Sequence, residues 1–233
     1  MIFQPTGPQM EYAESRPGAN DGLILNIYRG CNIGCTYCKA EEKEYRVKNN
    51  ARFLELLEKQ CKGMKGDPRP ILVCFNCDPY PKRGPYIDMT RETLLVLEKY
   101  EMNVRLMTRN GMRACKDFDI LKRNDWEFGQ SFPSMNGKSL RKWEPNAATK
   151  DERMAAFIKA YQLKIRHWIS VSPMWSMQEA DAVVRAYQDS IDKWTFAFIF
   201  GRYPMPGTQN ERKAWIEKVK RQLKGKNVTF RNS

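Results

Sequence analysis

Short apolar runs alternate with segments of helical periodicity along most of the 233-residue chain. The apolar runs predict buried strands, and apolar side chains that recur every three or four residues predict helices. The predicted strands are 23–27, 70–75, 104–108, 126–132, 165–172, 194–200 and a short final one at 227–231. The predicted helices are 50–64, 90–100, 113–123, 149–161, 176–187 and 207–224.

Polar residues mark where several of these helices begin. Thr149 and Glu152 have the spacing of a capping box, and so do Ser176 and Glu179. Thr90 is the expected N-cap of its helix. The stretch between the fourth strand and Pro145 is polar, and we expect it to be a loop.

Six strand-then-helix units therefore follow one another along the chain. Such alternation implies parallel strands joined by right-handed crossovers. A complete eight-unit barrel typically needs about 250 residues, so six units in 233 residues predict an α/β fold, a partial (β/α)6 barrel. We expect residues 1–22 to be an N-terminal extension, 23–206 the core, and 207–233 a basic C-terminal helix and tail that complete the barrel.

Three of the seven cysteines lie in one short stretch directly after the first predicted strand. Cys31, Cys35 and Cys38 have the spacing C-x3-C-x2-C. Three thiolates on one loop can hold three corners of an iron–sulfur cluster and leave a fourth metal position open. A three-cysteine zinc site and three free thiols are the alternatives. Zinc usually has four protein ligands, and the single histidine, His167, has no partner at the spacing of a zinc finger.

This cysteine stretch resembles the signature of the radical S-adenosylmethionine (SAM) enzymes. The longer string 26–31, together with Gly34 and Cys35, is similar to the spore photoproduct lyase-like branch of that superfamily. The resemblance implies a fold of the radical SAM type and a [4Fe–4S] cluster on the three cysteines, with SAM on the fourth iron. It also implies reductive cleavage of SAM to a 5′-deoxyadenosyl radical, with a reductant such as flavodoxin or ferredoxin supplying the electron.

The resemblance further implies which residues surround SAM, because the site of a βα barrel lies where its strands end. The segment 76–81 is similar to a Thr-Asp-Pro-Tyr-Gln-Pro segment of the family, with Cys77 in place of the threonine. Thr108-Arg109 is similar to a Thr-Lys pair whose lysine reaches the SAM carboxylate. The candidate cofactor-binding residues are Tyr37, Asn76, Asp78, Tyr80, Arg109, Ser131, Glu144, Arg153, Ser172 and Pro173. Cys77 is the candidate catalytic residue, as a hydrogen donor to the product radical.

Each of these roles has a structural alternative. Arg109 could be a surface charge, and Glu144 with Arg153 could form an ion pair that only supports the fold. Cys74 and Cys77 could be a redox pair or a second metal site, although buried cysteine is ordinarily inert packing. Phe200 with Gly201, like Ser172 with Pro173, is expected to close around the adenine.

Charge points to an anionic partner. Forty Lys and Arg residues against 27 Asp and Glu residues give a net charge of +13, which favours nucleic acid or a phosphorylated small molecule. Residues 211–233 contain eight basic and two acidic side chains. This segment is either a phosphate-contacting patch or a solvated helix face. Trp215 is either a stacking face for a base or part of a core stripe.

The odd number of cysteines, three of them clustered, favours a reducing compartment, and no apolar run approaches membrane-spanning length. We therefore expect a cytoplasmic enzyme without a membrane partner; nothing in the sequence indicates its oligomeric state. The expected substrate is nucleic acid or a nucleotide, in photoproduct repair by a lyase or in base modification. The alternatives are the same radical chemistry on a peptide or small metabolite, and a non-enzymatic metal-containing nucleic-acid-binding protein.

Overall fold

The structure is a computed structural model that describes residues 2–3, 22–38, 46–47, 52–80, 88–199, 201 and 203–231. Most of the predicted extension 1–22, the turn-rich stretch that follows Tyr80, and Phe200 lie outside the described residues.

Eight strands form one sheet, which is built mainly from parallel pairs. The strands are β1 (Ile2–Phe3), β2 (Leu23–Leu25), β5 (Ile71–Val73), β6 (Val104–Thr108), β7 (Glu127–Ser131), β8 (His167–Met174), β9 (Lys193–Phe198) and β10 (Asn227–Arg231). They lie in this order across the sheet, with β1 antiparallel to β2 and every other neighbouring pair parallel. Two further short strands, β3 (Tyr28–Arg29) and β4 (Arg46–Val47), form a separate antiparallel pair.

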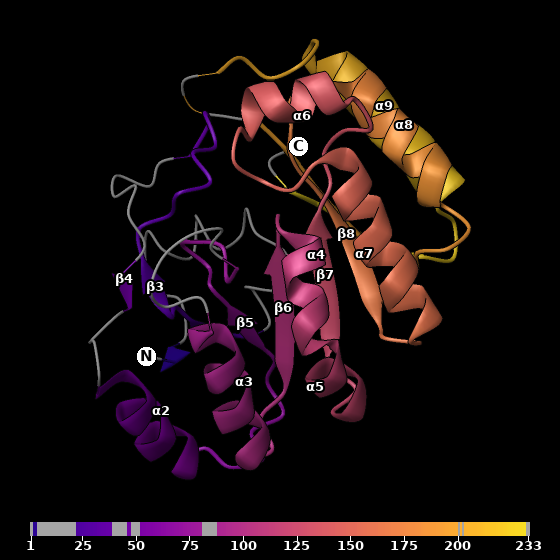
Figure 1. The fold of residues 1–233 in the computed structure, drawn as a ribbon. Coiled ribbons are helices and arrows are strands. Elements are labelled where there is room, and N and C mark those ends of the chain that lie inside the picture. Colours follow the sequence, from indigo (N-terminus) through magenta and orange to yellow (C-terminus); the bar gives the residue numbers. More distant parts are fainter. Residues whose placement is uncertain are drawn as a thin grey trace.

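The helices follow the parallel strands along the chain (Figure 1). They are α2 (Phe53–Lys62), α3 (Met89–Lys99), α4 (Gly111–Ala114), α5 (Phe118–Arg123), α6 (Gly137–Trp143), α7 (Lys150–Gln162), α8 (Met177–Tyr187) and α9 (Gln209–Gln222). In the described part of the chain the edge strands β1 and β10 do not pair with each other, so the sheet stays open. The predicted partial α/β barrel is therefore confirmed.

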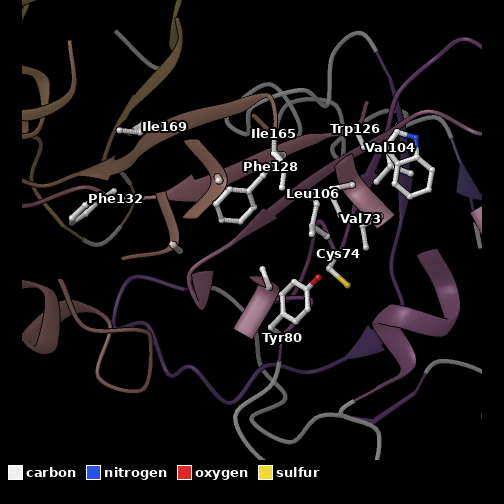
Figure 2. Close-up of a cluster of buried hydrophobic side chains, with 14 of the residues drawn as sticks. Val73, Cys74, Tyr80, Val104, Leu106, Trp126, Phe128, Phe132, Ile165 and Ile169 are labelled. Atoms are coloured by element: carbon white, nitrogen blue, oxygen red, sulfur yellow. The ribbon is translucent and has the colours of Figure 1, made fainter. Parts of the chain in front are cut away.

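The two faces of the sheet pack separately. Alternate strand residues such as Leu106, Phe128 and Ile169 join the buried helix residues in the larger core cluster, part of which is drawn in Figure 2. The residues between them face the other way and form a smaller cluster around Trp168. A Cβ at Gly129 would come within 2.2 Å of the Trp168 ring, so only glycine on β7 leaves room for this indole.

Most predicted elements are present, with shifted ends. The strands at 104–108 and 227–231 have the predicted bounds, and Thr149 with Glu152 forms the predicted capping box. Ser176 caps its helix by accepting from the Glu179 amide, but the Glu179 carboxylate bonds the indole of Trp175 instead of completing a box.

Two helix predictions are wrong in detail. Thr90 is not the N-cap, because α3 begins at Met89 and the Thr90 hydroxyl contacts the Pro79 carbonyl and the Tyr28 hydroxyl. The predicted helix 113–123 is broken, because a 3-10 turn at Cys115–Asp117 separates α4 from α5.

The predicted loop before Pro145 is also wrong, since it contains α6. The Asn136 side chain caps this helix by accepting hydrogen bonds from the Lys138 and Ser139 amides at 3.0 and 3.2 Å. Leu140 is the one residue of α6 that is buried, so the helix has no apolar periodicity for sequence reasoning to detect. Within the described part of the chain, no helix is both long enough and apolar enough to cross a membrane.

Candidate active site

The cysteine loop follows β2 and β3 and turns sharply. Gly30 and Gly34 have φ of 77° and 70°, values that favour glycine. All three cysteines of the loop carry reduced thiols, with Cys35 buried and the other two partly exposed. They contact one small apolar cluster that contains Ile33 and Ala147, so the loop brings the three side chains to the same part of the molecule.

The donor set fits an iron–sulfur cluster, because three thiols share one loop. Among the described residues, no three Cys, His, Asp or Glu side chains are already arranged to hold a metal ion. The three cysteines would therefore have to draw together when they bind one. Burial raises the pKa of the Cys35 thiol to about 12, so metal binding must also displace its proton.

His167 lies on β8 and takes no part in this loop. Its Nδ1 lies 2.7 Å from the Ile165 carbonyl, and its ring packs against Phe157 and Tyr161. His167 is thus packed within the fold. The side chains of the loop that can bind a metal are its three cysteines.

The cysteine loop rests on the segment that ends α6 and follows it. The Thr36 amide donates to the Trp143 carbonyl at 2.9 Å. From the other side, Asn146 donates its backbone amide to the Ile33 carbonyl at 3.1 Å and its side-chain amide to the Asn32 carbonyl at 3.0 Å. These bonds join two distant parts of the chain, since Thr36 and Trp143 are 107 residues apart in the sequence.

A buried ionic network lies directly behind the loop. Glu144 accepts from Arg153 at 2.5 Å, from Arg109 at 2.9 Å and from the hydroxyl of Tyr37, and both Glu144 and Arg153 are fully buried. Burial by itself would raise the pKa of Glu144, but the charges of Arg153 and Arg109 and the bond from Tyr37 hold it below its ordinary value. The expected pairing of Glu144 with Arg153 is present.

The predicted residues at the ends of β7 and β8 join the same network. Arg153 donates to the Ser131 carbonyl at 2.8 Å, and the Ser131 hydroxyl donates to the Ser172 carbonyl at 3.0 Å. That carbonyl also accepts from Arg109 at 3.3 Å. The peptide bond between Ser172 and Pro173 is cis. The network thus joins six predicted residues by hydrogen bonds, namely Tyr37, Arg109, Ser131, Glu144, Arg153 and Ser172.

Asp78 links the end of β5 to the end of β6. Its carboxylate accepts from the Thr108 hydroxyl at 2.7 Å, from the Arg109 amide at 2.6 Å and from the Tyr80 amide at 2.9 Å. Burial raises the pKa of this carboxyl, although the three hydrogen bonds oppose the rise. Asp78 therefore holds the backbone of Arg109 in place.

The other predicted residues after β5 are less central. The Tyr80 side chain is packed in the core (Figure 2), and its hydroxyl donates to Asp117 at 2.9 Å, not to the network around Glu144. Asn76 is exposed and its amide donates to the Asn26 side chain at 2.9 Å. Cys77 is buried and its thiol donates to the Tyr28 carbonyl at 3.5 Å. Binding of SAM by these residues stays a prediction.

Sequence reasoning missed an aromatic cluster beside the loop. Trp143 stacks on Trp175 with ring centroids 5.3 Å apart and meets Tyr203 edge-on at 5.0 Å. Tyr37 lies 6.2 Å from Trp175, and the Tyr203 hydroxyl donates to the Thr36 carbonyl at 3.0 Å. No spacing could reveal this cluster, because its members come from four separate segments of the chain.

Comparison with known proteins finds likeness in structure alone. No protein-family model matches the chain, and no curated protein sequence matches it. SuiB of Streptococcus suis bound to S-adenosylmethionine superposes with a TM-score of 0.68 and 14% identity, over 89% of this chain and 49% of SuiB. SuiB bound to its precursor peptide SuiA gives 0.68 and 15%, over 91% of this chain and 49% of SuiB. This chain thus spans about half the length of SuiB.

Spore photoproduct lyase complexed with dinucleoside spore photoproduct has a TM-score of 0.65 and 16% identity, over 93% of this chain and 77% of the lyase. The mixed α/β architecture with a parallel sheet that is described above matches that of both neighbours at these TM-scores. The fold of this chain is therefore that of the radical SAM enzymes.

Proposed function

We propose that the protein is a radical SAM enzyme in which Cys31, Cys35 and Cys38 hold a [4Fe–4S] cluster. The observation that carries this proposal is the set of three cysteine thiols on one loop, after β2 of a sheet that superposes on SAM-bound SuiB. When bound, the cluster and SAM supply a 5′-deoxyadenosyl radical by one-electron cleavage of SAM, with the electron coming from a reductant such as flavodoxin or ferredoxin.

In this proposal the buried network behind the loop receives the SAM carboxylate. Two guanidinium groups, Arg109 and Arg153, bond one carboxylate, Glu144, while the second buried carboxylate nearby, Asp78, accepts from the Arg109 backbone amide. Nε and Nη2 of Arg109 already donate hydrogen bonds, whereas Nη1 donates none to the described residues. Nη1 can therefore donate to an added carboxylate. Tyr37 fixes the position of this group by bonding both Arg109 and Glu144.

The remaining predicted residues take supporting roles in the same proposal. Asn76, Asp78 and Tyr80 lie on the β5 side, where the SAM amino group is expected, while Ser131, Ser172 and Pro173 lie where the ribose and adenine are expected.

Cys77 is proposed as the hydrogen donor to the product radical. Its hydrogen bond with Cys74 and its burial raise the pKa of its thiol well above the ordinary value. It therefore keeps its S–H hydrogen at neutral pH, as a donor must.

For the substrate we propose nucleic acid or a nucleotide, in a lyase-type repair or a base modification within the cytoplasm. The net charge of +13 supports this class, and spore photoproduct lyase is complexed with a dinucleoside photoproduct. A peptide is the second candidate, because SuiB is bound to a precursor peptide.

The cluster is tested by anaerobic reconstitution with iron and sulfide. Wild-type protein should turn brown and hold about four irons per chain, and replacing Cys31, Cys35 and Cys38 with alanine should remove this iron. A matched variant changes Cys61 and Cys115, two cysteines buried elsewhere, and should retain it. A colourless wild-type protein that binds zinc instead would contradict the proposal.

A further inference from the structure

The surface beside the cysteine loop carries basic side chains that the protein itself does not neutralise. Helix α6 presents Lys138, Arg141 and Lys142, all of them exposed, and its sequence contains no acidic residue. None of the three forms an ion pair within the described parts of the chain, and Lys142 lies 5.9 Å from the Trp143 ring. Three unneutralised charges therefore lie on a helix of seven residues.

These three side chains lie on one side of α6. Residues three and four positions apart are neighbours on a helix surface, which places Arg141 and Lys142 beside Lys138. Leu140 is buried on the opposite side and anchors the helix to the core. The arrangement can follow a chain of phosphates along the helix.

In the C-terminal region, where the sequence suggests a phosphate-contacting patch, three of the eight basic residues are ion-paired. Lys218 pairs with Asp181, Lys220 with Glu217 at 2.8 Å, and Lys226 with Asp192 at 2.7 Å. Asp181 and Asp192 lie outside the basic segment 211–233, so a count along the sequence does not include them. Trp215 is a core residue whose indole donates to Asp181 at 2.8 Å, so the core alternative for this tryptophan is confirmed.

Helix α6 also ends at the proposed active site. Its last residue, Trp143, is partly exposed and accepts the Thr36 amide of the cysteine loop, and the next residue, Glu144, belongs to the buried network. Figure 1 shows α6 at the top of the view. A polymer bound along α6 therefore reaches the cysteine loop.

We propose that α6 and Trp143 form a docking surface for single-stranded nucleic acid. Lys138, Arg141 and Lys142 contact phosphates, and the partly exposed Trp143 ring, which already stacks on Trp175, extends this aromatic stack toward a base. This inference rests on the proposed function for the class of substrate and adds where that substrate docks. An acidic peptide would use the three charges but would not need the stacking face.

The first test measures binding of a single-stranded DNA oligonucleotide to the reconstituted full chain at several salt concentrations, without reductant. Changing Lys138, Arg141 and Lys142 to glutamine should lower the slope of log K against log salt by about two, since each contact to a single strand contributes about 0.7. The matched variant changes Lys218, Lys220 and Lys226 to glutamine, which removes the same charge from ion-paired positions. Its slope should equal that of wild type.

The second test separates nucleic acid from other polyanions. Trp143→Leu should weaken binding of the oligonucleotide by about fivefold to a hundredfold, the effect of losing one stacked base. It should leave binding of heparin, which has no bases, unchanged.

Three outcomes would overturn the inference: a wild-type slope in the α6 variant, an equal loss in the matched variant, or equal weakening of both ligands by Trp143→Leu. A protein that cleaves SAM but does not bind the oligonucleotide keeps its proposed radical chemistry and loses this docking surface alone.

Discussion

Glu144 shows how single residues hold the site together. Burying a carboxylate is costly unless charged partners and hydrogen bonds satisfy it. Arg153, Arg109 and Tyr37 provide these partners, and each comes from a different part of the chain. One carboxylate thus fixes the cysteine loop, the end of β6 and the start of α7 relative to one another.

Glu144→Gln should destabilise the fold strongly, by about 3–5 kcal/mol, because two buried guanidiniums lose their counter-charge. Urea unfolding monitored by circular dichroism measures the change. Glu217→Gln is the matched variant, since Glu217 forms an exposed ion pair with Lys220 and its loss should hardly move the midpoint. Similar shifts for the two variants would argue against the network as a stabilising element.

The same carboxylate predicts a dependence of stability on pH. Its pKa is lower in the folded protein than its ordinary value of 4.5. A group of this kind stabilises the fold above its unfolded-state pKa, and the stabilisation is lost as the pH falls through the folded-state pKa. The difference in unfolding free energy between wild type and Glu144→Gln should therefore shrink as the pH falls below 4.5. A constant difference at acid pH would show that Glu144 does not titrate in this way.

Arg109→Ala should weaken SAM binding by roughly 1.5–3 kcal/mol if the guanidinium meets the SAM carboxylate directly. Equilibrium dialysis of SAM against the anaerobic, iron-loaded protein measures this loss. Arg166→Ala, which removes an arginine paired with Asp125 at the surface, should bind SAM as wild type does. Unchanged affinity in the Arg109 variant would leave that residue a purely structural role.

At the scale of elements, α6 is the support of the cysteine loop. The helix is short and buries one side chain, so its N-cap matters more than in a longer helix. Asn136→Ala should cost about 1 kcal/mol of stability, while Asn136→Asp, which keeps the accepting oxygen, should cost little. Thermal unfolding of the three proteins compares them. An alanine variant as stable as the aspartate variant would mean that the cap contributes nothing.

Elements with a buried apolar face could be predicted from the sequence, and those without one could not. The strand at 104–108 is mostly apolar and is buried on both sides of the sheet, so the sequence predicts its bounds correctly. Helix α6 was missed because a single leucine anchors it. The sequence wrongly predicts Thr90 as an N-cap, because its hydroxyl instead contacts the Pro79 carbonyl and the Tyr28 hydroxyl, which are distant along the chain.

The sequence likewise predicts one part of the candidate site and not the other. The spacing of the cysteines is local, so the sequence shows it directly. The aromatic cluster of Trp143, Trp175 and Tyr203, and the ion pairs of Lys218 and Lys226, depend on segments that only the fold brings together.

At the scale of the whole molecule, parallel strands explain why distant residues converge. All strands of the eight-stranded sheet except β1 run in one direction, so the residues that follow them gather at one end of the sheet. The cysteine loop, Asp78, Arg109, Ser131 and Ser172 all come from this end. In the described part of the chain the edge strands β1 and β10 do not pair, so the sheet stays open, as expected for a partial barrel.

Reductive cleavage of SAM is the direct test of radical SAM chemistry in this protein. The reconstituted wild-type protein, given SAM and dithionite without oxygen, should release 5′-deoxyadenosine, slowly and even without substrate. The variant lacking Cys31, Cys35 and Cys38 should release none, while the variant lacking Cys61 and Cys115 should match wild type. Iron-loaded wild-type protein that releases no 5′-deoxyadenosine, or equal release by the triple variant, would contradict the assignment of this chain as a radical SAM enzyme.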